Sequence, residues 1–376
     1  MTTFTFDDYC NELGPEKIVH IYDPASGLRA MVVVDNVACG PAIGGVRMAP
    51  DVTVDEVFRL ARAMTLKNAA AGLPHGGGKS GIVADPKVAD KPRLLRVFAR
   101  AIGELVDYIP GPDMGTDETC MAWIQDETGR SVGLPRVLGG IPLDEIGATG
   151  LGIAVCAEIC APRCGIDMRG AKVAVEGFGN VGQHAARFLE QRGAILVAAS
   201  DSRGAIYNEQ GIPVQQLIET KRSAGSVTQY DGGQVLPREE LMTVACDILI
   251  PAARPDSIHA GNAPRIQARL IVEGANIPST PEAETVLHER NVLVVPDFIA
   301  NAGGVICASV EYHGGTEPAA LQQIEEKVGR NTRELLERLD SSQRRPREEA
   351  MAMALERVQQ AMALRARPEG RTTGGI

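Results

Sequence analysis

Residues 172–182, with the sequence KVAVEGFGNVG, contain the pattern that decides the fold. The apolar run at 172–176 predicts a buried strand, and Gly177, Gly179 and Gly182 follow it with the spacing GxGxxG. In this pattern the first glycine forms a tight turn, the second lets the backbone approach a pyrophosphate, and the third lets the next helix pack on the strand. The stretch therefore predicts a strand–turn–helix unit that binds a dinucleotide.

The residues after the glycines bear on which dinucleotide binds. Asn180 and Val181 begin the expected helix, whose free N–H groups can bind phosphates. Asp201 closes the next expected strand, 19 residues beyond Gly182, where an acidic residue can bond the ribose hydroxyls of NAD. Arg203, two residues further on, could instead meet the 2′-phosphate of NADP. The sequence favours NAD and leaves NADP open.

The chain around this unit alternates strands with helical stretches, which predicts an α/β fold with a parallel, doubly wound sheet. Strands are expected at 172–176, 195–200, 247–251, 270–273 and 292–295. Earlier in the chain, the pattern predicts a hairpin at 18–35 and helices at 53–71, 91–106 and 117–130. Helices are also expected at 150–164 and after about 318.

A stretch rich in Gly and Pro, 133–150, separates the two halves and predicts two domains. We expect a first domain at 1–142, a Rossmann-like dinucleotide-binding domain at 143–312, C-terminal helices at 313–366 that pack back, and a flexible tail at 367–376.

The composition is that of a globular protein, with 44% apolar and 23% charged residues among 376. The net charge of −10 argues against nucleic acid or an anionic membrane as a partner. No apolar run reaches the ~20 residues that span a bilayer, and the N-terminal sequence does not resemble a secretion signal. The eight cysteines are scattered, which suits reduced thiols in the cytoplasm, and Cys156, Cys160 and Cys164 fit a buried stripe better than a metal site.

Two lysines and an aspartate are candidates for catalysis. Lys67 lies in an otherwise apolar helical stretch, and Lys79 follows the glycine cluster 76–78, which we expect to be a loop. A phosphate-binding loop GxxxxGK[ST] is excluded because Leu73 stands where its first Gly is required. A lysine held close to backbone and removed from water can have a pKa near neutrality. Asp113 lies in a Gly/Pro loop, where it is either a catalytic carboxylate or a helix N-cap.

Seven motifs occur in one order and together resemble the glutamate/leucine/phenylalanine/valine dehydrogenase family. They are GGVRM (44–48), LKNAAAGLPHGGGKSGI (66–82), GPDMGT (111–116), GATGLG (147–152), VAVEGFGNVG (173–182), EGANIPST (273–280) and NAGGV (301–305). The resemblance runs from about residue 15 to 312. It implies reversible oxidative deamination of an amino acid to a 2-oxo acid and ammonia, with the first domain binding substrate, and assembly as a symmetric homo-oligomer.

The resemblance also implies roles for individual residues. Lys67 would hold the substrate α-carboxylate, Lys79 would be the general base that activates water, and Asp113 would move the proton at the amino nitrogen. Residues along the cofactor would include two that orient the nicotinamide carboxamide, Thr149 and Asn301, and a third, Asn276.

The side-chain pocket departs from the glutamate-specific branch of the family. That branch has a Lys before the Gly-Gly of its GGxR motif and a Ser seven residues after the Asn of NAGGV, whereas this chain has Ile43 and Ala308. Burying a second substrate carboxylate beside these residues and Gly44 would be costly. We therefore expect an apolar substrate such as leucine, valine, isoleucine or phenylalanine. A glutamate dehydrogenase with an altered pocket and a non-catalytic nucleotide-binding regulator are the alternatives.

Overall fold

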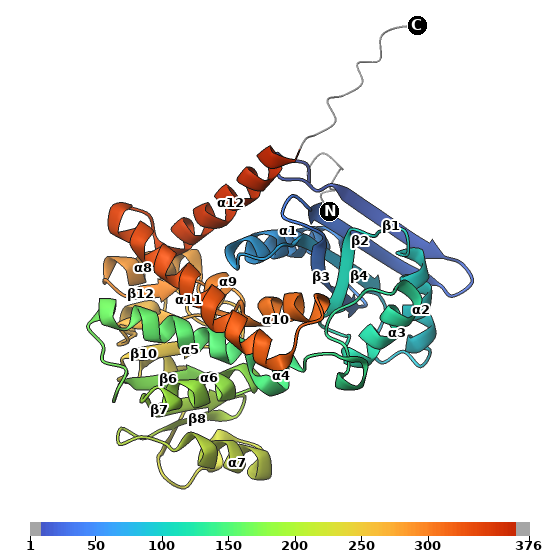
Figure 1. Ribbon diagram of the computed structural model, residues 1–376. Coiled ribbons are helices and arrows are strands. Elements are labelled where there is room, and N and C mark those ends of the chain that lie inside the picture. Colours follow the sequence, from blue (N-terminus) through green and yellow to red (C-terminus); the bar gives the residue numbers. More distant parts are fainter. Residues whose placement is uncertain (1–8, 366–376) are drawn as a thin grey trace, which may run out of the picture. The chain divides into compact units, whose positions relative to one another are not determined.

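The computed structural model describes residues 9–365, and the chain divides into two compact units (Figure 1). Unit 1 takes the residues up to Gly140 and those from Ala352 onward, and unit 2 runs from Ile141 to Met351. The tail predicted at 367–376 lies outside the described residues. Within 9–365, no helix is long and apolar enough to cross a membrane.

Unit 1 is built on a five-stranded sheet in the order β1-β2-β4-β3-β5. Its elements are β1 (Lys17–Asp23), β2 (Leu28–Asn36), β3 (Ala42–Ala49), α1 (Val54–Ala70), β4 (Gly76–Val83), α2 (Lys91–Ala101), β5 (Tyr108–Pro112), α3 (Glu118–Thr128) and the end of α12 (Pro346–Leu364). The antiparallel pair β1–β2 confirms the predicted hairpin, and β3 pairs in parallel with both β4 and β5.

Helices cover both faces of this sheet (Figure 1). On one face, Met31 and Val33 of β2 pack with Val57 and Ala61 of α1. The opposite face holds a larger cluster to which α2 and α3 contribute, including the fully buried Phe98. Helix α1 begins where the Thr53 side chain accepts a hydrogen bond from the backbone N–H of Glu56, a regular N-cap.

The glycine cluster 76–78 is not a loop, contrary to the expectation above, but the start of strand β4 in the middle of the sheet. Each glycine lies where a neighbour approaches too closely for a side chain. A Cβ at Gly76 would lie 1.7 Å from the Asn36 carbonyl oxygen, and one at Gly77 would lie 2.0 Å from the backbone N of Thr65 in α1. A Cβ at Gly78 would lie 2.9 Å from the Tyr108 ring. The glycines therefore permit tight packing of the strand.

Unit 2 contains a seven-stranded sheet in the order β12-β11-β10-β6-β7-β8-β9. Its strands are β6 (Lys172–Glu176), β7 (Ile195–Asp201), β8 (Gly204–Tyr207), β9 (Gln234–Leu236), β10 (Ile248–Pro251), β11 (Leu270–Val272) and β12 (Leu293–Val295). Its helices are α4 (Leu143–Ile146), α5 (Ala148–Cys160), α6 (Asn180–Gln191), α7 (Val214–Ala224), α8 (Pro281–Glu289), α9 (Asp297–Ala300), α10 (Gly303–Tyr312), α11 (Glu317–Ser341) and the start of α12.

The five strands that were predicted are present and mutually parallel, which confirms the doubly wound core. Two strands that the sequence did not predict, β8 and β9, extend the sheet at one edge. β8 runs antiparallel to β7, and β9 runs antiparallel to β8. The chain leaves β6 through α6 to β7 and returns on the other side of β6 as β10. In such sheets, ligands bind beyond the carboxyl ends of the strands at the point where the order reverses.

Candidate active site

Lys79 and Asp113 form an ion pair in unit 1. Lys79 lies in the middle of β4, Asp113 follows the last residue of β5, and Lys79 Nζ is 2.7 Å from Asp113 Oδ2. The two side chains are 8% and 21% exposed. Burial lowers the pKa of Lys79 below its ordinary value, and the Asp113 carboxylate opposes this shift without reversing it. Burial raises the pKa of Asp113, but Lys79 and Arg47 outweigh it and hold that pKa below its usual value.

Two further charges complete this cluster, and the sequence analysis did not single them out. Arg47 of β3 donates from Nε to Asp113 Oδ2 at 3.1 Å and also pairs with Glu56, in the first turn of α1. The four side chains form a chain of alternating sign from Lys79 to Glu56. Side chains alternate across a strand, so recognition of 42–49 as a strand would have placed Arg47 on one face with Ile43 and Gly45.

The two glycines of the GGVRM motif serve different faces of β3. A Cβ at Gly45 would lie 2.7 Å from Asp113 Cβ and 3.1 Å from Lys79 Nζ, so this glycine makes room for the ion pair. A Cβ at Gly44 would lie 1.6 Å from the Gly78 carbonyl oxygen. The Gly44 carbonyl accepts a hydrogen bond from the Tyr108 hydroxyl at 2.9 Å. The structure gives Gly44 a packing role, and its contact with substrate stays a prediction.

The other two predicted residues of unit 1 lie around the same face of the sheet. Ile43 precedes Gly45 by two positions, so its side chain points to the face that carries Lys79, and it is 4% exposed. Lys67 is half-buried in the last turn of α1, the helix that covers this face. Ala308 belongs to α10 of unit 2, where it is half-buried.

The glycine fingerprint in unit 2 has the geometry of a dinucleotide cradle. Gly177 has φ +88°, and a Cβ there would lie 2.7 Å from the Ala253 backbone. A Cβ at Gly182 would lie 2.1 Å from the Gly177 carbonyl oxygen, whereas Gly179 faces open space. Helix α6 begins at Asn180, so its free N–H groups lie beside that space. A turn, an open backbone position and a close helix contact are the three requirements of the fingerprint, and the residues fit the cofactor.

The residues expected near the nicotinamide also come together. Asn301 donates from Nδ2 to the Asn276 Oδ1 at 3.1 Å and to the Gly274 carbonyl at 3.3 Å. Its own Oδ1 is buried and accepts no hydrogen bond from any residue in 9–365. A Cβ on Gly304 would lie 3.5 Å from the Thr149 hydroxyl oxygen, so the starts of α5 and α10 are adjacent. A buried, unpartnered amide oxygen suits the N–H group of a carboxamide.

The Asp201 carboxylate is hydrogen-bonded to other residues of unit 2. Its carboxylate accepts hydrogen bonds from the backbone N–H groups of Arg203 and Val227 and from the Ser226 hydroxyl, at 2.8–3.1 Å. Burial raises the pKa of Asp201, but these hydrogen bonds outweigh it and keep the pKa low. A Cβ on Gly225 would lie 3.5 Å from the Arg203 guanidinium, which therefore lies at the end of α7.

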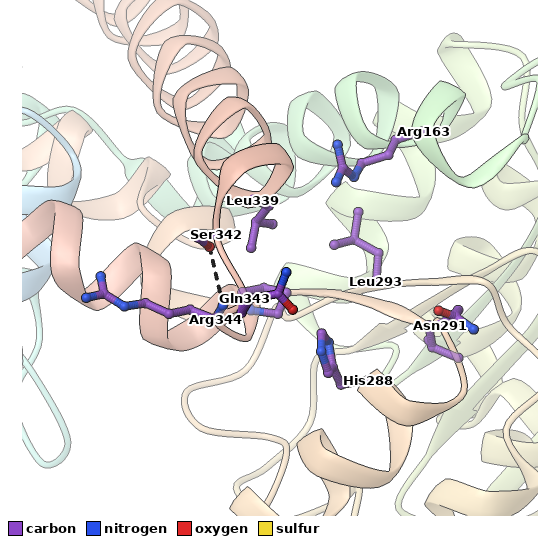
Figure 2. Close-up of a pocket in the computed structure, with 10 residues that line it drawn as sticks. Arg163, His288, Asn291, Leu293, Leu339, Ser342, Gln343 and Arg344 are labelled. Carbon is purple, nitrogen blue, oxygen red and sulfur yellow. Dashed lines mark hydrogen bonds between the residues drawn. The ribbon is translucent and has the colours of Figure 1, made fainter.

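A separate cavity of about 260 Å³ lies in unit 2 near the turn between α11 and α12 (Figure 2). Arg163, Arg344 and His288 line it. Arg163 pairs with Asp340, and Arg344 lies 3.7 Å from a Glu349 carboxylate oxygen, so each guanidinium already has a carboxylate partner. We assign this cavity no part in the site.

Comparison with known proteins agrees with the two units. Residues 139–366 match the family model described as glutamate/leucine/phenylalanine/valine dehydrogenase, and residues 15–130 match the model described as the dimerisation domain of these enzymes. Glutamate dehydrogenase of Thermotoga maritima is 47% identical over 296 residues, which are 74% of this chain and 71% of that protein. The enzyme of the same name from Aeropyrum pernix is 41% identical over 88% of this chain and 85% of its own length.

Solved structures show the same similarity. The hetero-hexameric glutamate dehydrogenase of Thermus thermophilus, in a leucine-bound form, has a TM-score of 0.81 at 33% identity, covering 94% of this chain and 90% of that one. L-Tryptophan dehydrogenase of Nostoc punctiforme has a TM-score of 0.74 at 26% identity, covering 93% of this chain and 98% of that one. The chain belongs to the glutamate/leucine/phenylalanine/valine dehydrogenase family and is an NAD(P)-dependent amino-acid dehydrogenase, an oxidoreductase.

Proposed function

We propose that the chain catalyses reversible oxidative deamination of an L-amino acid, with Lys79 as general base and Asp113 as the proton carrier at nitrogen. The ion pair between the buried Lys79 and the half-buried Asp113 is the observation that carries this proposal. When bound, the cofactor would supply the oxidant that takes a hydride from the substrate Cα and leaves an imine. Lys79 then takes a proton from the water that adds to the imine carbon. Asp113 takes a proton from the substrate ammonium group before the oxidation and returns it to the nitrogen of the carbinolamine. The C–N bond then breaks, the carbinolamine hydroxyl loses its proton to solvent, and ammonia and the 2-oxo acid result.

The environment of each group suits its role. A general base must be unprotonated near the working pH, and burial favours the neutral amine of Lys79. Asp113 stays ionised beside two cations and can accept a proton from the substrate ammonium group. We assign the substrate α-carboxylate to Lys67. We assign the nicotinamide carboxamide to Thr149 and Asn301.

We further assign residues 1–142 to substrate binding and catalysis and residues 143–312 to the cofactor. The unit boundary after Gly140 and the separate locations of the ion pair and the glycine cradle support this division. The match of residues 15–130 to a dimerisation domain supports association through unit 1, and the hetero-hexameric Thermus relative supports an oligomer; we propose that the subunits are identical.

For the substrate side chain, we propose an apolar group such as that of leucine, valine, isoleucine or phenylalanine. Ile43 supports this proposal, because it is buried on the face of β3 that carries the ion pair and offers no charge to a second carboxylate. Glutamate is the second candidate, and the names of the Thermotoga and Aeropyrum relatives favour it. The name of the tryptophan dehydrogenase among the similar structures supports an apolar substrate side chain.

A substrate panel tests both the proposed reaction and the proposed substrate side chain. Purified protein is assayed for NADH and NADPH formation with leucine, valine, isoleucine, phenylalanine, tryptophan and glutamate. Turnover of an apolar substrate without glutamate turnover would support the role of Ile43, and the reverse would refute it. Lys79→Ala should lower kcat by about 10²–10⁴-fold, and the exposed Lys87→Ala should not. Normal turnover by Lys79→Ala would remove the mechanism.

A further inference from the structure

Three cationic side chains line a cavity of about 380 Å³ at the carboxyl ends of β6, β7 and β10. They come from separate segments. Lys221 lies in the last turn of α7, Arg238 begins a 3₁₀ helix after β9, and Arg254 follows β10. Ser202 and Gly179 line the same cavity, so the cations share it with the dinucleotide cradle.

The two arginines have no partner among residues 9–365. Neither Arg238 nor Arg254 makes a hydrogen bond or an ion pair with another described residue, and Arg254 is exposed. Both arginines act on Glu176: burial raises the pKa of this carboxyl, and the two guanidiniums oppose that shift without reversing it. Lys221 donates to the Phe178 carbonyl at 2.6 Å and lies 3.8 Å from Asp201.

The charges of the cavity do not balance. Three cations face two carboxylates, Asp201 and Glu176, and Asp201 already accepts three hydrogen bonds within unit 2. The cavity therefore carries an excess of positive charge, and the unpaired guanidiniums are available for a ligand. Guanidinium groups bind phosphate oxygens with two parallel hydrogen bonds, which makes them well suited to a phosphate dianion.

The position of the cavity indicates which phosphate group of the dinucleotide the cations would contact. In this fold the residue at the end of the second strand lies beside the 2′ oxygen of the adenine ribose. That residue is Asp201, whose side chain is 7% exposed and already accepts three hydrogen bonds. It has little capacity left for ribose hydroxyls. Arg203, the cation suggested by the sequence, is not among the residues that line the cavity.

We propose that Arg238 and Arg254, with Lys221, bind the 2′-phosphate of NADP, so that this chain prefers NADP to NAD. This inference rests on the cofactor site of the proposed function and replaces the preference for NAD that Asp201 indicated. The curated relatives include both NAD-specific and NADP-specific enzymes and do not decide the matter.

Calorimetry with the full-length protein tests the inference without catalysis. Adenosine 2′,5′-bisphosphate and 5′-AMP differ only in the 2′-phosphate. We expect the bisphosphate to bind at least about tenfold more tightly at low salt, because each charge-assisted contact is worth about a factor of ten or more. The advantage should shrink as ionic strength rises.

Variants assign the effect to residues. Arg238→Ala and Arg254→Ala should each reduce the advantage of the bisphosphate by about tenfold and leave 5′-AMP affinity within about twofold. Arg203→Ala is the matched control, since its guanidinium lies outside the cavity, and should change neither affinity. Thermal unfolding checks that each variant is folded.

The outcomes separate this inference from the proposed function. Equal affinity for the two nucleotides would overturn the inference and leave the cofactor site intact. Weakened binding of 5′-AMP in the variants would also overturn it, because the arginines would then hold the 5′-phosphate. Binding of neither nucleotide would overturn both the inference and the cofactor site.

Discussion

The charges around Lys79 determine the pH at which it can act as a base, and they can be removed one at a time. Arg47 Nε and Lys79 Nζ contact the same oxygen of Asp113, at 3.1 and 2.7 Å. The two cationic nitrogens therefore lie within about 6 Å of each other, where their repulsion is about 0.7 kcal/mol in water and about 3 kcal/mol at an effective dielectric constant of 20. Those energies correspond to about 0.5–2 pKa units. Arg47 thus helps burial to lower the pKa of Lys79.

Arg47→Met removes the charge and keeps most of the side-chain volume. Without Arg47 the pKa of Lys79 rises, so the neutral amine appears only at higher pH. The rising limb of kcat/KM against pH should move up by about 0.5–2 units. Glu56 has the opposite effect on Lys79 because its charge is negative, so Glu56→Gln should move the limb down by a smaller amount.

The assay is kcat/KM for the best amino acid, measured across pH at saturating cofactor. Arg59→Met is the matched control. Arg59 lies in α1, as Glu56 does, but its side chain is mostly exposed and pairs with Asp55. Shifts of the same sign in Arg47→Met and Glu56→Gln, or no shift in either, would show that the limb does not report Lys79. The general-base assignment would then fail.

Three other changes test separate parts of the structure. Ile43→Lys should raise kcat/KM for glutamate relative to leucine by about tenfold or more, because it supplies a cation for the second carboxylate; an unchanged ratio on the substrate panel would place the pocket elsewhere. Burial raises the pKa of Glu273 to about 7 despite its contact with Arg347, so its contribution to stability is present below pH 4.5 and falls by about 3 kcal/mol as pH rises through 7. Glu273→Gln should remove that pH dependence from the unfolding free energy measured in urea. The same pH dependence in the variant and the wild-type protein would refute the raised pKa of Glu273. Phe98→Ala, at a fully buried position of unit 1, should cost about 3–5 kcal/mol of unfolding free energy by the same measurement.

The elements that the sequence predicted well are those whose signals are local. The hairpin β1–β2 and the strand–glycine–helix unit at 172–191 depend on alternation, turn residues and glycine spacing within one short stretch. The cluster 76–78 was mispredicted as a loop because consecutive glycines usually mark turns. Their reason for being glycine lies elsewhere in the chain, in the Asn36 carbonyl and the backbone of α1. No window around residue 77 contains that information.

The same limit applies to the candidate site. Lys79 and Asp113 are 34 positions apart, and only the family resemblance placed them together, whereas the structure gives their contact directly. Arg47 was overlooked because 42–49 was not recognised as a strand. The cavity cations come from the last turn of α7 and from the segments after β9 and β10, and no sequence spacing relates them.

The glycines and the buried charges of unit 1 depend on each other. A lysine in the centre of a sheet would normally be costly, because the ammonium loses its water. Here Gly45 leaves the space into which Lys79 and Asp113 extend, and Gly77 lets α1 lie directly on β4. The pair is thereby removed from solvent, which lowers the pKa of Lys79, while Asp113 keeps its charge through Arg47. A glycine-rich stretch that suggests a loop therefore produces a desolvated amine with a lowered pKa, and this is the property that a base working near neutral pH requires.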